Sequence, residues 1–338
     1  MRSDARDAEV RLMSLTPALA AALLAAAPGG AAPGGAHLAV RTASGWTTFW
    51  REGYAPARWG GPDSAVTSAT LWRAGARGIS WGELELGGSG EAWRTRLVVA
   101  RLDPSRVRLA LVNGVSPGGL APVWKVEDAS DSVLLALNAG QFTGAAPWGW
   151  VVHAGREYRP PGRGPLATAI IVEEDGSVTF TDDAGLARRR RSGTARHPAH
   201  VAEAFQSYPA LLTGEGEVPA LVRIPGPDID LGHRDARLAI GQLADGALLV
   251  VMTRFDALGE SLGGIPFGLT VPEMAAVMGA LGCRRAVALD GGVSAQLLVR
   301  DATGERHLWR GVRRVPLGLV ATARWPITAM VETTHQEE

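Results

Sequence analysis

Short apolar runs separated by glycine-rich or Asp-Pro turns fill most of the chain from residue 78 onward. Such runs are typical of β-strands, and the clearest of them cover residues 79–86, 93–102, 107–112 and 133–137. Two Asp-Gly pairs, at residues 175–176 and 245–246, lie between apolar runs and predict β-hairpins. The pattern therefore predicts a chain built mainly of short strands.

One segment has a helical pattern instead. Over residues 270–281, apolar side chains recur at helical spacing. Thr270 and Glu273 match a capping box, and Pro272 fits the first turn, where its missing N–H costs little. Gly282 is expected to end the helix. Together with the strands, this helix predicts an α+β fold with β-rich mixed sheets, few helices and a functional site at the strand ends.

The 338 residues divide by composition into four predicted segments. They are a leader or signal-like segment (1–36), a Trp- and Gly-rich N-terminal extension (37–77), a main domain (78–325) and a C-terminal tail (326–338). From Met13 the leader reads as a short Ala/Leu run, the length of a signal-peptide core and too short to span a bilayer. We expect an exported protein, secreted, periplasmic or at the cell envelope. A disordered leader on a cytoplasmic protein is the alternative.

Composition limits the partners. Hydrophobic residues make up 46% and charged residues 20% of the chain, as in globular proteins. The formal net charge of +0 gives no electrostatic case for nucleic acid. No run beyond the leader is long enough for a transmembrane helix, so we expect no integral membrane association of the mature chain. Four arginines at 188–191 lie in a segment, 187–200, that we predict to be a solvated loop.

Tryptophan and cysteine usage are both unusual. Eleven Trp outnumber six Phe and three Tyr together, and four of the Trp lie in the N-terminal extension: Trp46, Trp50, Trp59 and Trp72. Indole faces stack on sugar rings, so a saccharide-contacting flap is one interpretation, and a small satellite core over the main sheet is the other. Cys283 is the only cysteine, which excludes an intrachain disulfide, and we expect it to pack rather than react.

The most informative segment is an apolar strand that ends on an acid. Residues 286–289 read as a short buried strand, and Asp290, Gly291 and Gly292 follow at once. A strand of this kind holds the carboxylate at the edge of the core, while the glycines leave room for a ligand. A tight turn in which the aspartate caps its own backbone fits the same residues.

Further motifs accompany this segment in a fixed order. They are NAGQF (138–142), QSYPALL (206–212), RLAIG (237–241) with its Asp-Gly hairpin, and GLTVPEMAAVMGALGC (268–283) leading into ALDGGVS (288–294). In order and rough spacing the chain resembles the phosphodiester glycosidases over about residues 78–325. Val293 stands where the family often has a third glycine, Ala288 where it often has Asn, and Leu238 where it often has Thr.

The resemblance implies a secreted or lumenal hydrolase that removes a sugar from a phosphodiester at the anomeric carbon. The implied type is an N-acetylglucosamine-1-phosphodiester α-N-acetylglucosaminidase-like enzyme acting on a glycan or sugar-phosphate substrate. Many bacterial members of the family are linked to exopolysaccharide, so we expect cell-envelope or exopolysaccharide-type glycans as substrates.

The leaving phosphate sets what the site needs. Cationic or N–H donors must hold the phosphate, and a carboxylate must lie near the anomeric carbon. We predict Asp290 as nucleophile or general base, Arg237 as phosphate clamp, and Asn138 as the residue that holds sugar hydroxyls or orients Asp290. The predicted substrate-binding residues are Gly140, Gln206, His233, Gly291, Gly292 and Ser294. A structural ion pair of Arg237 with Asp235 or Asp290 is the alternative for that arginine.

Several alternatives stay open at this stage. Asp235, Asp256 and Glu260 are candidate second acids. The chain contains no HExxH, CxxC or EF-hand spacing, so we assign no metal ligands and no cofactor, although a structural divalent cation is not excluded. An inactive relative that binds polysaccharide, and a phosphoesterase of teichoic-acid-like polymers, are the two rival functions.

Overall fold

The computed structural model describes residues 35–90, 92, 95–116, 118–191, 200–224, 231–255 and 268–324. The chain divides into two compact units, Met1–Gly35 and Ala36–Glu338, and the elements below belong to the second. The predicted leader at 1–36 and tail at 326–338, and the candidate acids Asp256 and Glu260, lie almost wholly outside the described residues.

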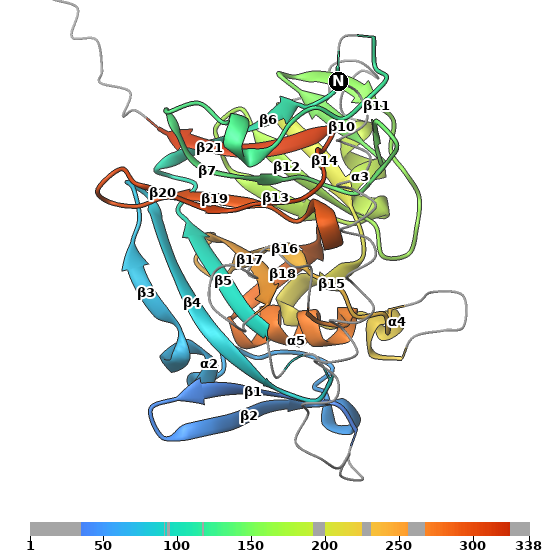
Figure 1. The fold of residues 1–338 in the computed structure, drawn as a ribbon. Coiled ribbons are helices and arrows are strands. Elements are labelled where there is room, and N and C mark those ends of the chain that lie inside the picture. Colours follow the sequence, from blue (N-terminus) through green and yellow to red (C-terminus); the bar gives the residue numbers. More distant parts are fainter. Residues whose placement is uncertain are drawn as a thin grey trace, which may run out of the picture. The chain divides into compact units, whose positions relative to one another are not determined.

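A nine-stranded sheet forms the centre of this unit (Figure 1). Its strand order is β15-β18-β16-β17-β5-β4-β1-β2, and β3 also pairs with β4. The bounds are β1 (His37–Thr42), β2 (Gly45–Arg51), β3 (Leu71–Ala74), β4 (Ile79–Gly88), β5 (Thr95–Leu102), β15 (Ala210–Leu212), β16 (Leu238–Leu243), β17 (Leu248–Phe255) and β18 (Cys283–Ala288).

Two five-stranded sheets and a two-stranded ribbon complete the β-structure. One five-stranded sheet has the order β11 (Arg156–Arg159), β10 (Val151–His153), β14 (Val201–Ser207), β12 (Thr168–Glu173) and β13 (Val178–Thr181). The other has the order β20 (Arg306–Trp309), β19 (Leu297–Arg300), β7 (Val133–Asn138), β21 (Leu317–Ala323) and β6 (Val107–Asn113). The ribbon pairs β8 (Phe142–Thr143) with β9 (Ala146–Pro147).

Helices are few and short in the described part of the chain. The α-helices are α2 (Ser64–Ala69), α3 (Asp183–Arg190), α4 (Ala220–Arg223) and α5 (Val271–Ala280). Single 3-10 turns are η1 (Glu52–Tyr54), η3 (Val126–Asp128), η4 (Gly214–Gly216) and η6 (Gly292–Ser294). The predicted α+β, β-rich fold is confirmed. Strand pairings among the described residues are all antiparallel, where mixed sheets were expected, because parallel neighbours need long crossover connections.

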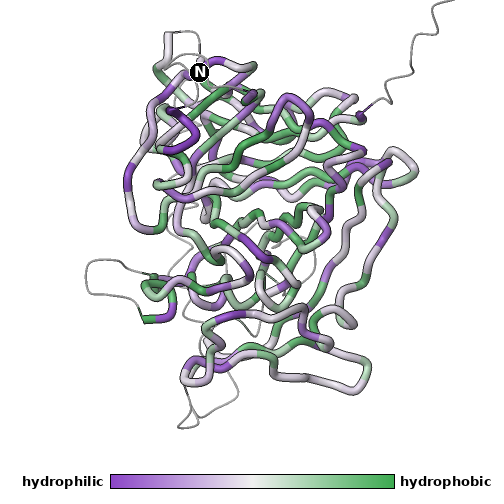
Figure 2. Tube along the Cα trace, turned by 180° about the vertical axis from the view of Figure 1, so that it is seen from behind, coloured by the Kyte–Doolittle hydropathy of each residue, from purple (hydrophilic) through white to green (hydrophobic). Residues whose placement is uncertain are grey.

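The central strands of the nine-stranded sheet are largely buried on both faces, which explains why they read as nearly continuous apolar runs; these strands are β15, β18, β16, β17 and β5. Successive side chains of a strand point to opposite faces. In β17, Leu249 and Val251 therefore pack into the core that α5 covers, while Val250 and Met252 pack into the core shared with the two five-stranded sheets. Figure 2 shows the hydrophobic residues concentrated along these inner segments, and Figure 1 shows α5 running beneath β15 and β18.

The N-terminal extension belongs to the same sheet. β1 and β2 form a hairpin that pairs with β4 through β1, and β3 pairs with β4 on its own. Trp50 is buried in the α5-side core and Trp59 packs partly against it, so these two indoles join the main core rather than a separate satellite core. Trp46 and Trp72 are instead exposed on the surface. The indoles of the extension thus divide between packing and exposure.

The predicted helix at 270–281 is confirmed as α5, with Thr270 as N-cap. The Glu273 N–H donates to Thr270 Oγ1 at 3.3 Å, and the Thr270 N–H donates to Glu273 Oε2 at 3.0 Å, which is the predicted capping box. Gly282 follows the helix with φ +92°, a left-handed conformation that glycine adopts without a steric penalty. α5 leads directly into β18, which ends two residues before Asp290.

The predicted solvated loop at 187–200 is wrong over its first part, where the chain forms α3. Asp182 caps the helix by accepting the Gly185 N–H at 2.8 Å. The arginines lie at the helix C-terminus, where the helix dipole favours positive charge, and two of them pair with carboxylates: Arg189 with Glu173 and Arg190 with Glu157. The N-cap, the helix dipole and the ion pairs together stabilise α3, although its sequence lacks apolar periodicity.

Candidate active site

Asn138 joins two sheets beside the predicted catalytic acid. It is the last residue of β7 and is 1% exposed. Its Nδ2 donates to the backbone oxygen of Asp290 at 2.7 Å, and its Oδ1 accepts the Gln296 N–H at 3.0 Å. The side chain therefore fixes the main chain on both sides of the Asp290 turn. This arrangement fits the orienting role predicted for Asn138, acting through the backbone of Asp290.

The glycines after Asp290 allow the turn to lie directly against the segment before β16. A Cβ on Gly291 would lie 2.3 Å from the Ala236 carbonyl oxygen, closer than any real contact. Gly292 has φ +56°, and its N–H donates to the same carbonyl at 2.8 Å. A Cβ on Gly292 would lie 2.8 Å from Asp235 Oδ2. The turn thus brings the carboxylate of Asp235 close to the loop that carries Asp290.

The Asp290 carboxyl is half-buried, and its surroundings raise its pKa above the usual value of 3.8. Burial is the largest cause, because it penalises the charged form. A hydrogen bond from Ser294 and the positive charge of Arg313 oppose this effect, whereas the negative charge of Asp235 adds to it. Asp290 is therefore a more basic carboxylate than an exposed aspartate, with a cation and a second acid nearby.

Arg313 is a residue that the sequence analysis did not select. The N–H groups of Val312 and Arg313 donate to the Val293 carbonyl at 2.9 and 3.0 Å, and the Arg313 guanidinium lies 4.8 Å from the Phe142 ring centroid. Arg313 is one of thirty-four Lys and Arg residues, and no local sequence pattern distinguishes it from the others, so only the fold identifies it.

The Val293 side chain is 46% exposed, which explains how this chain accommodates a side chain at the third-glycine position.

Arg237 lies on the other side of the turn, at the edge of a pocket. Its Nε donates to the Leu269 carbonyl at 2.7 Å and its Nη2 donates to the His233 carbonyl. The Arg237 N–H donates to Thr253 Oγ1 at 2.7 Å. These bonds hold the guanidinium in one orientation, with His233 itself exposed and contributing its backbone oxygen.

The pocket has a volume of about 480 Å³. Twelve described residues line it: Gln141, Trp148, Arg163, Gly164, Pro165, Leu166, Ala167, Tyr208, Pro209, Leu231, Arg237 and Val271. Gln141 links it to the catalytic turn, because its Nε2 donates to the carbonyls of Leu289 and Tyr208, both at 3.1 Å. A cavity lined by two arginines is therefore linked through Gln141 to the strand end that carries Asp290.

Gln206 and Gly140 have structural surroundings. The Gln206 Oε1 accepts the N–H groups of Trp150 and Gly162, and its Nε2 donates to the Gly162 carbonyl and to Asp183. A Cβ on Gly140 would lie 2.3 Å from the Gln206 carbonyl oxygen. Both residues brace the segment around residues 148–164, which forms part of the pocket wall. Their predicted substrate contacts stay a prediction.

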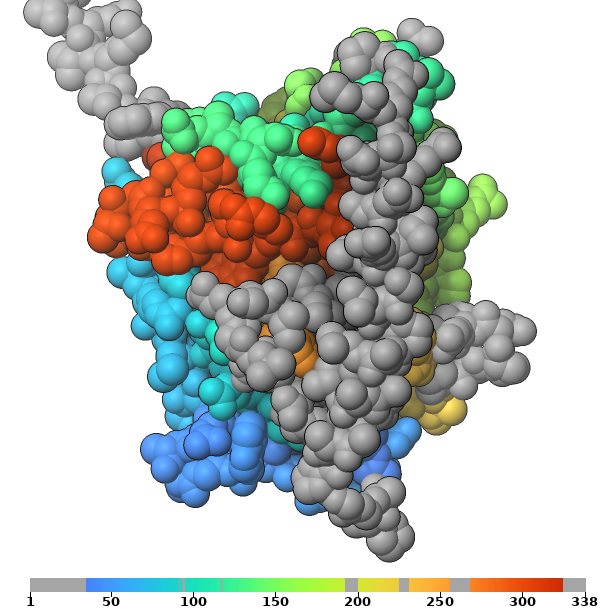
Figure 3. Space-filling model, viewed as in Figure 1, coloured from blue at the N-terminus to red at the C-terminus, as the bar shows by residue number. Residues whose placement is uncertain are grey.

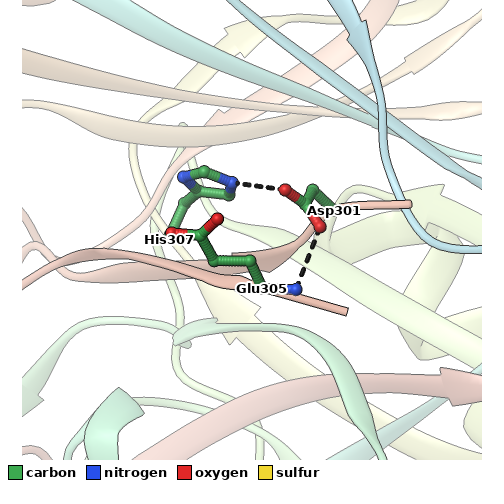
Figure 4. Close-up of side chains that lie close together, drawn as sticks. All are labelled: Asp301, Glu305 and His307. Carbon is green, nitrogen blue, oxygen red and sulfur yellow. Dashed lines mark hydrogen bonds and ion pairs between the residues drawn. The ribbon is translucent and has the colours of Figure 1, made fainter. Parts of the chain in front are cut away.

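One group of potential metal ligands lies away from this site. Asp301, Glu305 and His307 offer ligand atoms within 4.8 Å of one another on the β19–β20 hairpin (Figure 4). Asp301 Oδ2 pairs with His307 Nε2 at 3.0 Å, while Oδ1 accepts bonds from Thr303 and Glu305. These bonds lower the pKa of Asp301 and fold the hairpin tip, which lies beside β3 and β4 on the face seen in Figure 3.

Cys283 is buried, and burial raises the pKa of its thiol far above the usual range. A thiol that stays protonated is neither a nucleophile nor a ready metal ligand. This agrees with the expectation that it packs rather than reacts.

Comparison with known families assigns the chain. Residues 131–322 match the family model of phosphodiester glycosidase. The protein belongs to the phosphodiester glycosidase family. The matched region contains Asn138 and the charged groups placed around the candidate site, which are Asp235, Arg237, Asp290 and Arg313.

Three solved structures are similar to this chain at low sequence identity. The catalytic domain of zebrafish N-acetylglucosamine-1-phosphodiester alpha-N-acetylglucosaminidase, auto-inhibited by its pro-peptide, matches with a TM-score of 0.50 and 16% identity over 76% of this chain and 89% of that one. A hypothetical protein from Synechocystis (TM-score 0.43, 12% identity, 75% and 76% coverage) and a putative exported protein from Burkholderia pseudomallei (0.41, 16%, 91% and 89%) are also similar. Comparison with curated proteins gave no match. Within the described residues, no helix is long and apolar enough to cross a membrane.

Proposed function

We propose that this family member hydrolyses a sugar 1-phosphodiester at the anomeric carbon. The bond between the anomeric carbon and the ester oxygen breaks, water supplies the new oxygen on the sugar, and the aglycone leaves as a phosphate monoester. A phosphate monoester departs as an anion without prior protonation of its oxygen, so the protein mainly has to hold negative charge and supply one basic carboxylate.

The observation that carries this proposal is the half-buried Asp290 beside the Arg313 guanidinium, at a turn that packs against the segment carrying Arg237. Its raised pKa makes it a stronger base or nucleophile than an exposed carboxylate. The positive charge of Arg313 acts on Asp290, and Arg237 lines the neighbouring pocket. We assign Asp290 to attack on the anomeric carbon or activation of water, and Arg237 to the phosphate, which a guanidinium binds bidentately.

Asp235 and Asn138 complete the arrangement. Asp235 lies against Gly292, and its negative charge raises the pKa of Asp290, so Asp235 is the second acid we select. Asn138 is a positioning residue, because its side chain bonds to the main chain of Asp290 and Gln296 rather than facing the pocket. His233, Gly291, Gly292 and Ser294 would shape the site around the substrate.

The test compares wild type with Asp290→Asn on UDP-N-acetylglucosamine and on para-nitrophenyl-phospho-N-acetylglucosamine. Loss of the carboxylate should lower kcat/KM by about 100-fold or more, the usual cost of removing a charged catalytic group. The melting temperature should not fall, because the folded state penalises the ionised form of Asp290. Asp131→Asn is the matched control, since Asp131 is 97% exposed and far from the turn in sequence.

An active Asp290→Asn variant would contradict the assignment. Hydrolysis in oxygen-18 water separates the reaction classes: label in the sugar supports the glycosidase, and label in the phosphate supports a phosphoesterase. Sugar binding without turnover, unchanged in Asp290→Asn, would indicate an inactive polysaccharide-binding relative.

The substrate context is also a proposal. We propose that the protein is exported and acts on cell-envelope or exopolysaccharide-type glycans, which the signal-like run from Met13 supports. A mature chain that begins near residue 37, measured by mass spectrometry on protein from the periplasm or medium of a bacterial host, is the expected result. An intact N-terminus on cytoplasmic protein would contradict export.

A further inference from the structure

We propose that the 480 Å³ pocket lined by Arg237 binds the aglycone, and that it selects an aglycone with a second anionic group and a flat ring. A nucleoside diphosphate, the aglycone of a nucleoside diphosphate sugar, has this chemistry. This inference rests on the proposed function, because it identifies the leaving group of the same site. It depends on four features of the pocket: its charge, its aromatic wall, its size and its place relative to Asp290.

The pocket lining carries two positive charges and no negative one. Arg163 and Arg237 are the charged residues among its described lining residues. The Arg163 side chain is exposed and forms no ion pair or hydrogen bond with any residue that the structure describes. Two guanidinium groups facing one cavity suit an anion with more than one charge, since each pairs with a phosphate through parallel N–H donors.

The opposite wall is aromatic and apolar. The rings of Trp148 and Tyr208 lie 4.5 Å apart, centroid to centroid, at 70°. Leu166, Pro209 and Val271 continue the apolar lining. A half-buried indole and the exposed Tyr208 ring, in a pocket that two arginines also line, offer a surface on which a flat ring can stack. The volume falls within the range of about 300–1,000 Å³ that is typical of small-molecule sites, which leaves room beyond a single phosphate.

The position of the pocket assigns it to the leaving group. Gln141 bonds to the carbonyl of Leu289, the residue before Asp290, and lines the pocket. Arg237, the predicted clamp of the scissile phosphate, lies at its edge. A substrate with its anomeric carbon at Asp290 and its first phosphate at Arg237 would extend its aglycone toward Trp148, with Arg163 within reach of a second phosphate.

The experiment measures selectivity with Arg163→Gln. The two substrates are UDP-N-acetylglucosamine, with two phosphates, and para-nitrophenyl-phospho-N-acetylglucosamine, with one phosphate and a flat ring. The ratio of their kcat/KM values should fall by about tenfold in Arg163→Gln, the effect of losing one charge-assisted contact. Arg159→Gln is the matched control, because Arg159 is an exposed arginine on β11 that does not line the pocket, and it should leave both rates unchanged.

Calorimetry with simple anions tests the pocket independently of turnover. Wild type should bind pyrophosphate about tenfold more tightly than phosphate, and Arg163→Gln should lose that preference. Equal affinity for the two anions in wild type, or an unchanged kcat/KM ratio in Arg163→Gln, would overturn the inference. If wild type hydrolyses neither substrate but shows an Arg163-dependent pyrophosphate preference, the proposed function fails while the anion specificity of the pocket stands.

Discussion

At the scale of single residues, the pKa of Asp290 results from opposing effects that can be separated by mutation. Burial raises its pKa most, Ser294 and Arg313 lower it, and Asp235 raises it. The two charged neighbours lie on different segments, one before β16 and one in the loop that bonds to Val293. Each can therefore be neutralised without touching the turn that carries the carboxylate.

These opposing charges predict opposite shifts in the pH profile. The acid limb of kcat/KM reports the pKa of the free enzyme's catalytic base, here Asp290 in its ionised form. Arg313→Gln removes a lowering effect, so the acid limb should move to higher pH. Asp235→Asn removes a raising effect, so the limb should move to lower pH. Arg314→Gln is the control, because that arginine pairs with Asp128 instead.

Steady-state kinetics between about pH 3 and 8 would measure the acid limb of each variant, because this range spans ordinary and raised carboxyl pKa values. Shifts of the same sign in Arg313→Gln and Asp235→Asn would show that Asp290 is not the group that titrates.

The sequence predicted the centre of this site but not its surroundings. Asp290 and its glycines are contiguous, and a strand, an acid and a tight turn form a local pattern. Arg313 and Gln141 lie near Asp290 only because β7 and the loop after β20 meet the end of β18, and no local pattern encodes that contact. The pairing of Asn138 with the main chain of Asp290 spans 152 residues for the same reason.

At the scale of elements, the sequence predicted the helix whose capping residues and apolar spacing are complete, and it missed the helix that ion pairs to distant residues stabilise. α5 carries its cap, its apolar spacing and its terminating Gly282, so its limits could be predicted closely. α3 has a polar surface, and carboxylates from β11 and β12 neutralise its arginines. Those partners are distant in sequence, which is why a loop was predicted there.

The N-terminus of α5 supports the segment that carries Arg237 through one ion pair. Arg234 donates to both Glu273 oxygens, at 2.6 and 2.7 Å, and Glu273 is 1% exposed. Glu273→Ala leaves Arg234 without its partner and also breaks the capping box, so we expect a loss of about 3–5 kcal/mol in the free energy of unfolding. Thr270→Ala removes only the cap and should cost about 1 kcal/mol.

Denaturant unfolding of the two variants gives the comparison directly. A Glu273→Ala loss no larger than that of Thr270→Ala would show that the ion pair adds nothing beyond the cap.

At the scale of the whole described unit, the central sheet has a hydrophobic core on each face, so charged side chains are favoured only at its edges and strand ends. The polar side chains of the site gather where β7 and β18 end and β16 begins, next to the pocket. Arg254, near the end of β17, departs from this arrangement. It follows Val250 and Met252 on the face that packs into the inner core, and it is 4% exposed.

Arg254 is a buried charge with incomplete compensation. Its Nη2 donates to the Arg310 carbonyl at 3.4 Å, its Nε has no hydrogen-bond partner among the described residues, and burial lowers its pKa to about 10. For a basic group, a folded pKa below the unfolded one means that the charged form is disfavoured in the fold. The cost is therefore fully present at neutral pH and disappears only when the group is neutral in both states.

Arg254→Met should accordingly raise the free energy of unfolding at pH 7 by about 1–3 kcal/mol, the range seen when apolar side chains of similar volume replace buried charges. Arg254→Ala is the control for packing: it removes the same charge but leaves a cavity, so it should be clearly less stable than Arg254→Met. Thermal unfolding of the three proteins decides between charge and packing. If Arg254→Met is less stable than wild type, the arginine contributes more through its contact with Arg310 than its burial costs, and the loop that carries Arg313 depends on it.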